Sequence, residues 1–118
     1  MVWKGIEKRR FIRANFPCKI VISTPSQHVI VTHTENIGAG GIRVIIDEKL
    51  DISSMVGLDI HLSNDLIKSK ARIVWVVEAG DSSHDRPLRY DTGIEFYEIN
   101  EDDRKIINNF VEAFTGES

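Results

Sequence analysis

The sequence predicts a mostly β fold, a six-stranded antiparallel barrel followed by one C-terminal α-helix. Six short apolar runs, separated by residues typical of turns, follow one another between positions 18 and 97. After position 100 the spacing of the apolar residues changes to that of a helix. The 118 residues contain no repeat, low-complexity tract or linker, which predicts a single domain around one core.

The first three strands are expected at residues 18–23, 28–34 and 42–46. In the first, Cys18, Ile20 and Ile22 alternate with residues that would face the other side of the sheet. Residues 24–27 read Thr-Pro-Ser-Gln, a typical turn sequence, so the first two strands should form a hairpin. The third strand resumes the apolar pattern after an interruption at residues 35–41.

The last three strands are expected at residues 56–62, 66–78 and 88–97. The clearest alternation lies in the fourth strand, where Leu58, Ile60 and Leu62 face one way. The same period places four residues of the fifth strand on one face, namely Ala71, Ile73, Trp75 and Val77. Trp75 is therefore expected in the core.

The final segment has helical periodicity. Asn100 is a suitable N-cap, and the acidic residues after it match the positive end of the helix dipole. Five apolar side chains then form one stripe, at Ile106, Ile107, Phe110, Val111 and Phe114. Gly116 suits the helix end. We expect the stripe to cover an open end of the barrel.

Charge is distributed unevenly along the chain. The net charge is −3, but residues 1–20 hold six basic and one acidic side chain (6 − 1 = +5), so the remainder carries −3 − 5 = −8. Residues 1–16 lack a clear period and are predicted to form a flexible basic arm ahead of a barrel domain at 17–118. An acidic body repels DNA and RNA, whereas a basic arm can capture a small anion. A merely solubilising tail is the alternative.

Several functional classes find no support in the sequence. No apolar run approaches the length of a membrane span, and the N-terminus does not resemble a secretory signal. With the single Cys18, this favours a cytoplasmic protein. The four histidines lack metal-site spacing, and no Ser/His/Asp set or carboxylate pair stands out. We therefore expect no metal, no cofactor and no enzymatic activity.

Two short stretches have the chemistry of an anion site. Arg9, Arg10 and Arg13 lie close together in the arm, and the arginine fork matches phosphate oxygens or the O6/N7 edge of guanine. Arg-x-x-x-Arg alone is a weak motif. Asn36 precedes Gly38, Gly40 and Gly41, and an amide followed by glycines allows close backbone approach to a bound group.

The glycine-rich stretch has other possible interpretations. Gly40 and Gly41 could mark only a bulge at a barrel corner. A dinucleotide-binding Gly-x-Gly-x-x-Gly is not completed, because position 43 is arginine and no helix pattern follows. A phosphate-binding P-loop lacks its Gly-Lys-Ser/Thr.

Together, Arg9-x-x-x-Arg13 and Asn36-x-Gly38-x-x-Gly41 resemble the signature of the PilZ domain family, which binds the bacterial messenger cyclic di-GMP. The resemblance extends from position 7 to about position 114 and includes segments 73–75 and 91–96. It implies a six-stranded barrel whose outer surface holds the ligand, with the arginine arm folded over it. The implied ligand-binding residues, with Arg10 and Arg43 as additional cations, are Arg9, Arg10, Arg13, Asn36, Gly38, Gly41 and Arg43.

One position departs from the family pattern, because Gly38 occupies the place of a serine. Loss of one neutral hydrogen bond is worth ~0.5–1.5 kcal/mol, about tenfold in affinity at most. We therefore expect a cyclic di-GMP receptor that acts on an unidentified protein effector. The alternative is a PilZ-like adaptor that no longer binds ligand. An RNA-binding barrel would need exposed aromatics among basic strand residues, which the acidic body does not supply.

Overall fold

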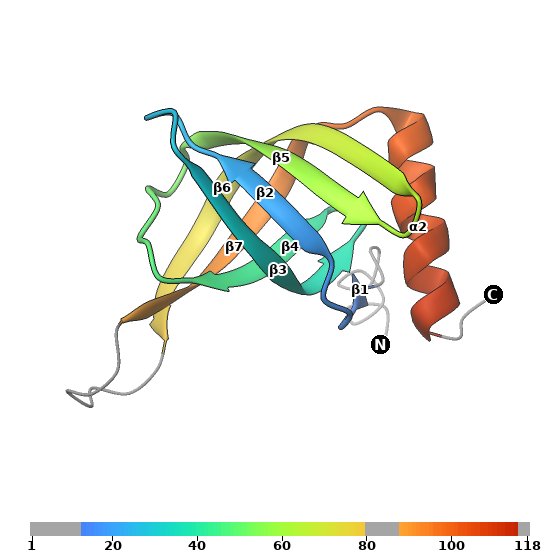
Figure 1. Ribbon diagram of the computed structural model, residues 1–118, viewed down its shortest axis with the longest axis horizontal. Coiled ribbons are helices and arrows are strands. Elements are labelled where there is room, and N and C mark those ends of the chain that lie inside the picture. Colours follow the sequence, from blue (N-terminus) through green and yellow to red (C-terminus); the bar gives the residue numbers. More distant parts are fainter. Residues whose placement is uncertain (1–12, 80–87, 116–118) are drawn as a thin grey trace, which may run out of the picture.

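The computed structural model describes residues 13–79 and 88–115. In that part of the chain it contains seven strands and one helix: β1 (Arg13–Ala14), β2 (Lys19–Ser23), β3 (Val29–Gly38), β4 (Gly41–Ile46), β5 (Met55–Leu62), β6 (Asp65–Ala79), β7 (Arg89–Glu98) and α2 (Glu101–Thr115). The predicted mostly β fold with a C-terminal helix is confirmed (Figure 1).

Six antiparallel strands close into a barrel. They run in the order β3-β2-β5-β6-β7-β4, and pairing of β3 with β4 completes the ring. The additional strand β1 lies within the segment predicted to be an arm. It pairs Arg13 with Gly38 and Ala14 with Ile37, on a part of β3 beyond its ladder with β2. Arg13 is therefore fixed beside the start of the glycine-rich stretch.

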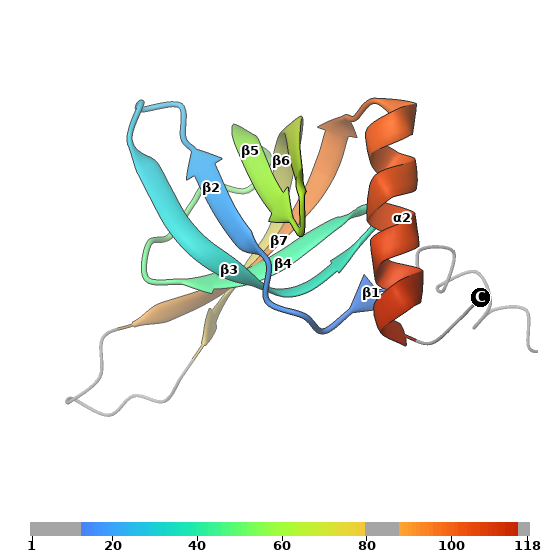
Figure 2. The ribbon, with the colours of Figure 1, turned by 45° about the vertical axis from the view of Figure 1, so that its right-hand side comes forward.

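The barrel interior is filled mainly by aliphatic side chains. The predicted alternation holds in β2 and β5, where Ile20 and Ile60, for example, are fully buried. Helix α2 lies across one end of the barrel and buries Ile107 and Val111 (Figure 2). Asn100 caps the helix, since its side-chain oxygen accepts a hydrogen bond from the Asp102 amide at 2.7 Å.

The predicted burial of Trp75 is wrong. The register between β6 and β7 shifts between Ile73 and Trp75, and this bulge adds one residue to β6. A one-residue shift reverses which side chains face the core. Ile73 is fully buried, but Trp75 is 39% exposed and Val77 is also exposed, while Val76 packs against the core instead.

Candidate functional site

The β3–β4 hairpin positions the glycine-rich stretch. β3 ends at Gly38, β4 begins at Gly41, and Ala39 and Gly40 form the turn between them. The Ala39 carbonyl accepts a hydrogen bond from Nη1 of Arg104 on α2 at 2.8 Å. The Gly40 carbonyl accepts one from the Phe96 amide at 3.0 Å. The turn is thus held by both the helix and the neighbouring strand.

Gly41 is required by the approach of two strands. A Cβ at this position would lie 2.2 Å from the Ile94 carbonyl oxygen, which belongs to the backbone of β7. Any larger residue would force β4 and β7 apart. The bulge on β3, between Thr34 and Asn36, lies elsewhere, so close packing is the reason for this glycine.

Arg13 brings the two sequence motifs together. Its Nε donates to the Asn36 side-chain oxygen at 2.7 Å, and its Nη2 donates to the Gly41 carbonyl at 3.3 Å. Of the five N–H donors of a guanidinium, these contacts use two. Partial burial of the guanidinium, and then the nearby charge of Arg43, lower the pKa of Arg13, but an arginine stays charged at neutral pH.

Arg43 lies on the outer surface between buried Ile42 and Val44, as the alternation predicts. Its Nε and Nη2 donate to the two carboxylate oxygens of Asp91, both at 2.8 Å. This hydrogen bonding raises the pKa of the Arg43 guanidinium. The pair is a bidentate fork, so the charge of Arg43 is already largely balanced.

A pocket of about 370 Å³ lies between these groups. Its lining residues come from β1, β3, β4, β6 and β7, and they include Arg13, Asn36, Gly41, Arg43, Trp75 and Glu95. The Trp75 indole lies over Gly93, where a Cβ would approach its Nε1 to 2.2 Å. Glu95 accepts a hydrogen bond from Arg72 at 3.2 Å. The pocket therefore combines cations, an aromatic face and a carboxylate.

The structure brings together four of the seven predicted site residues: Arg13, Asn36, Gly41 and Arg43 line this one pocket. Gly38 is buried beside them and pairs with both Arg13 and Gly41. Arg9 and Arg10 lie outside the described residues. The binding roles of all seven stay predictions.

Sequence reasoning missed the β6 and β7 side of the pocket. It treated Trp75 as a core residue, because strict alternation continues through the bulge. The clue in the sequence was Gly93 inside the predicted strand 88–97, since a glycine within a strand often marks close approach of another group. Its pairing with Trp75 depends on the bulge and could not be read from the sequence.

Residues 13–79 and 88–115 offer neither a metal site nor a membrane-spanning helix. No group of three or more His, Cys, Asp or Glu side chains there could hold a metal ion. Within the same ranges, no helix is long and apolar enough to cross a membrane.

Comparison with known proteins identifies similar folds. A family model described as PilZ domain matches residues 7–113. The curated proteins contain no match. The "PilZ domain with c-di-GMP of YcgR from Escherichia coli" is 9% identical, with a TM-score of 0.73 and 92% of both chains covered.

Two larger proteins contain a similar domain. The Bacillus subtilis Inhibitor of motility (MotI/DgrA) is 20% identical over 89% of this chain, with a TM-score of 0.73. The K. pneumonia MrkH–c-di-GMP complex is 13% identical over 92% of this chain, with a TM-score of 0.71. This chain spans about half the length of both, 50% and 53% respectively. At these identities the likeness shows the fold alone.

Proposed function

The chain belongs to the PilZ domain family, and on that premise we propose that it is a non-enzymatic receptor domain for cyclic di-GMP in bacterial second-messenger signalling. The ligand binds in the pocket beside the β3–β4 turn, in a cytoplasmic setting. Binding changes the surface that the domain presents to a protein effector. No cofactor takes part.

The arrangement of Arg13, Asn36 and Gly41 is the observation that carries this proposal. Among the described residues the guanidinium is held by two neutral partners, which leaves its charge and three of its donors (5 − 2 = 3) for an anion. A phosphate accepts from such a fork in a bidentate way. The side-chain oxygen of Asn36 accepts from Arg13, so the side-chain NH₂ of Asn36 would donate to a base or ribose.

The other walls of the pocket suit a purine base. Trp75 offers an aromatic face, on which a base can stack. Arg13 could alternatively meet the O6/N7 acceptors of guanine, and the Glu95 carboxylate could accept from the guanine N–H groups. Arg9 and Arg10 would add cations from the arm, and Gly38 would leave backbone where the family has a hydroxyl.

A ligand-free adaptor is the second candidate. Two observations favour it: Gly38 replaces the family serine, and Arg43 is engaged by Asp91. In an adaptor the same surface would recognise a protein. The adaptor interpretation leaves the charge of Arg13 unexplained, because the described partners of Arg13 are neutral.

Isothermal titration of the purified chain with cyclic di-GMP, with GTP as control, separates the two. The receptor proposal expects saturable binding of cyclic di-GMP in the micromolar range or tighter, and no comparable binding of GTP. Absence of binding at several hundred micromolar ligand, in a chain with an intact melting transition, would support the adaptor and overturn the receptor.

A further inference from the structure

The second half of β6 has an unpaired edge. The ladder with β5 ends where Met55 pairs with Arg72, and the turn residues Ser53 and Ser54 extend it by two hydrogen bonds to Ile73. Beyond that point lie residues 74–79, where, within the described part of the chain, Val74 is the unpaired bulge residue and residues 75–79 pair with β7 alone. We call this segment the β6 edge. Its backbone groups on the side away from β7 are available to another strand.

The β6 edge is apolar and unprotected. It reads Val-Trp-Val-Val-Glu-Ala, with Val74 38% and Val77 57% exposed. Figure 1 shows this end of β6, with the start of β7, extending away from the rest of the barrel. Monomeric proteins usually block such an edge with lysine, proline or an inward charge. The only charged residue of the β6 edge is Glu78. The bulge lies at the start of this segment and leaves residues 75–79 as regular strand.

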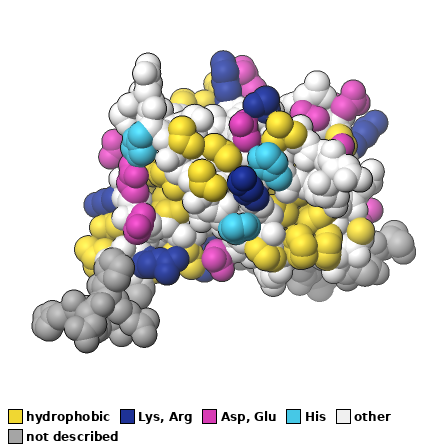
Figure 3. All heavy atoms as spheres, in the orientation of Figure 1, with side chains coloured by type: hydrophobic (Ala, Val, Ile, Leu, Met, Phe, Trp, Pro, Cys, Tyr) yellow, Lys and Arg dark blue, Asp and Glu magenta, His cyan; other side chains and the backbone are white. Residues whose placement is uncertain are grey.

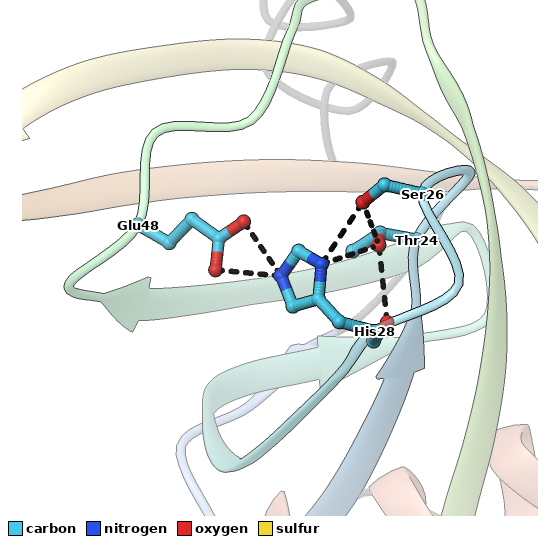
Figure 4. Close-up of polar contacts among 4 residues, drawn as sticks. All are labelled: Thr24, Ser26, His28 and Glu48. Carbon is cyan, nitrogen blue, oxygen red and sulfur yellow. Dashed lines mark hydrogen bonds and ion pairs between the residues drawn. The ribbon is translucent and has the colours of Figure 1, made fainter.

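Two other stretches of strand that lack a partner on one side carry protection against such pairing. Residues 65–69 of β6 lie beyond the β7 ladder and include the charged Asp65 and Lys68. Residues 29–33 of β3 lie before the β4 ladder, which leaves them without a partner on the β4 side; we call this opening the β3 gap. The side chain of His28 contacts Glu48 across the β3 gap at 2.7 Å (Figure 4).

The surroundings of the β3 gap are also polar. Nδ1 of His28 contacts Ser26 Oγ at 2.9 Å and Thr24 Oγ1 at 3.1 Å, so the cluster fixes the start of β3 opposite the end of β4. The barrel face around β2, β3 and β5 mixes hydrophobic and charged side chains of both signs (Figure 3). The exposed Val29 and Val31 are therefore not part of an uninterrupted apolar strand edge.

We propose that the β6 edge pairs antiparallel with the β6 edge of a second copy of this chain, around a two-fold axis near Val76. Valine and tryptophan then face valines across the interface, and such cross-strand pairs stabilise a sheet. A two-fold interface needs a self-complementary surface, and this run of side chains provides one.

The charge at Glu78 favours this orientation. With Val76 opposite itself, Glu78 of one copy faces Val74 of the other, four residues from the second Glu78. At ~3.4 Å per residue the two carboxylates are about 14 Å apart, beyond the ~8 Å screening length at physiological salt. Parallel pairing in register would instead place them side by side, ~4.8 Å apart.

The interface would adjoin the pocket, because Val74 and Trp75 line it. The inference itself does not depend on the ligand. A pairing of about five residues buries less than the ~1,000 Å² of a stable interface, so the association should be weak and concentration-dependent.

Sedimentation velocity of the ligand-free chain, from about 5 to about 500 μM, tests the proposal. The expected mass rises from 13.4 kDa toward twice that value. Val77→Lys should raise the dimer dissociation constant at least about tenfold by placing two like charges in the interface. Val31→Lys is the matched control, since Val31 is a similarly exposed strand valine (60%) away from the β6 edge.

Cross-linking gives a second measurement. The only native cysteine, Cys18, is buried, and burial raises the pKa of its thiol, so it should stay unreactive. Val76→Cys should form an intermolecular disulfide on mild oxidation, because paired residues lie at disulfide distance, whereas Val31→Cys should not.

Three results would overturn the inference. The wild-type chain could remain monomeric at about 500 μM, which would leave the β6 edge to a strand of another protein. Val31→Lys could weaken association as much as Val77→Lys. Val76→Cys could cross-link no better than Val31→Cys.

Discussion

The two arginines of the pocket differ in what holds them. Arg13, on the β1 and β3 side, donates to the Asn36 amide oxygen and to a backbone carbonyl. Arg43, on the β4 and β7 side, makes a bidentate pair with Asp91. Burial and Arg43 lower the pKa of Arg13, whereas hydrogen bonding to Asp91 raises that of Arg43.

The difference teaches that an arginine beside a pocket is not necessarily a free positive charge. Neutral partners orient the Arg13 guanidinium without compensating it, so an arriving anion gains its full attraction. Arg43 must first share its donors between Asp91 and a ligand. We therefore expect the two sides of the pocket to contribute unequally to binding of cyclic di-GMP.

The strongest test replaces each arginine in turn. Arg13→Ala should weaken cyclic di-GMP binding about 100-fold, because charge-assisted hydrogen bonds worth ~1.5–3 kcal/mol are lost. Arg43→Ala should weaken it less than about fivefold, since Asp91 already occupies its donors. Isothermal titration of both variants measures the contrast, and equal losses would contradict it.

Arg13→Lys refines the same experiment. Lysine keeps the charge but lacks the fork that contacts Asn36 and Gly41 together. If orientation by neutral partners matters, Arg13→Lys should bind nearly as poorly as Arg13→Ala. Recovery of wild-type affinity would show that charge alone suffices.

Replacing Trp75 compares the contribution of aromatic stacking with that of charge. It lies on the Arg43 side of the pocket, where we expect stacking to contribute more than electrostatics. Trp75→Ala should weaken binding about tenfold, within the ~1–3 kcal/mol of base–aromatic stacking. Val31→Ala, on another strand face, serves as control. Unchanged affinity of Trp75→Ala for cyclic di-GMP would exclude the indole from the site.

The sequence alone was sufficient for most of the fold. Strict alternation in β5 identified Leu58, Ile60 and Leu62 as core residues, and all three are buried. Asn100 and the helical stripe located α2. These features depend on local periodicity, which a single sequence displays.

The features that sequence reasoning missed depend on contacts between distant segments. The bulge near Val74 is set by pairing with β7, so alternation within β6 could not reveal that Trp75 points outward. β1 has only two residues, too few for a periodic pattern. The Arg43–Asp91 pair joins residues 48 positions apart. Spacing placed a cation at position 43 but could not show that it is neutralised.

A substitution at Gly38, which pairs with Arg13, tests the Arg13 side of the pocket. Gly38→Ser restores the hydroxyl of the family pattern next to Arg13, and one added hydrogen bond should tighten cyclic di-GMP binding by up to about tenfold. Titration calorimetry measures the gain, and a thermal melt checks that the buried position accepts the serine. Weaker binding by a variant that melts like wild type would show that the glycine is itself required for the ligand.

The smallest effect comes from releasing Arg43. Asp91→Asn removes the carboxylate that balances this arginine, and one unit charge at ~8 Å in a water-like medium is worth about 0.5 kcal/mol. Cyclic di-GMP binding should therefore tighten about twofold at low salt, and the gain should shrink as salt screens the exposed charge. The double variant Asp91→Asn/Arg43→Ala should show no gain, because the arginine that Asp91→Asn releases is then absent. If the double variant binds as tightly as Asp91→Asn, the carboxylate acts directly on the ligand, and the two sides of the pocket differ for a reason other than the pairing of Arg43.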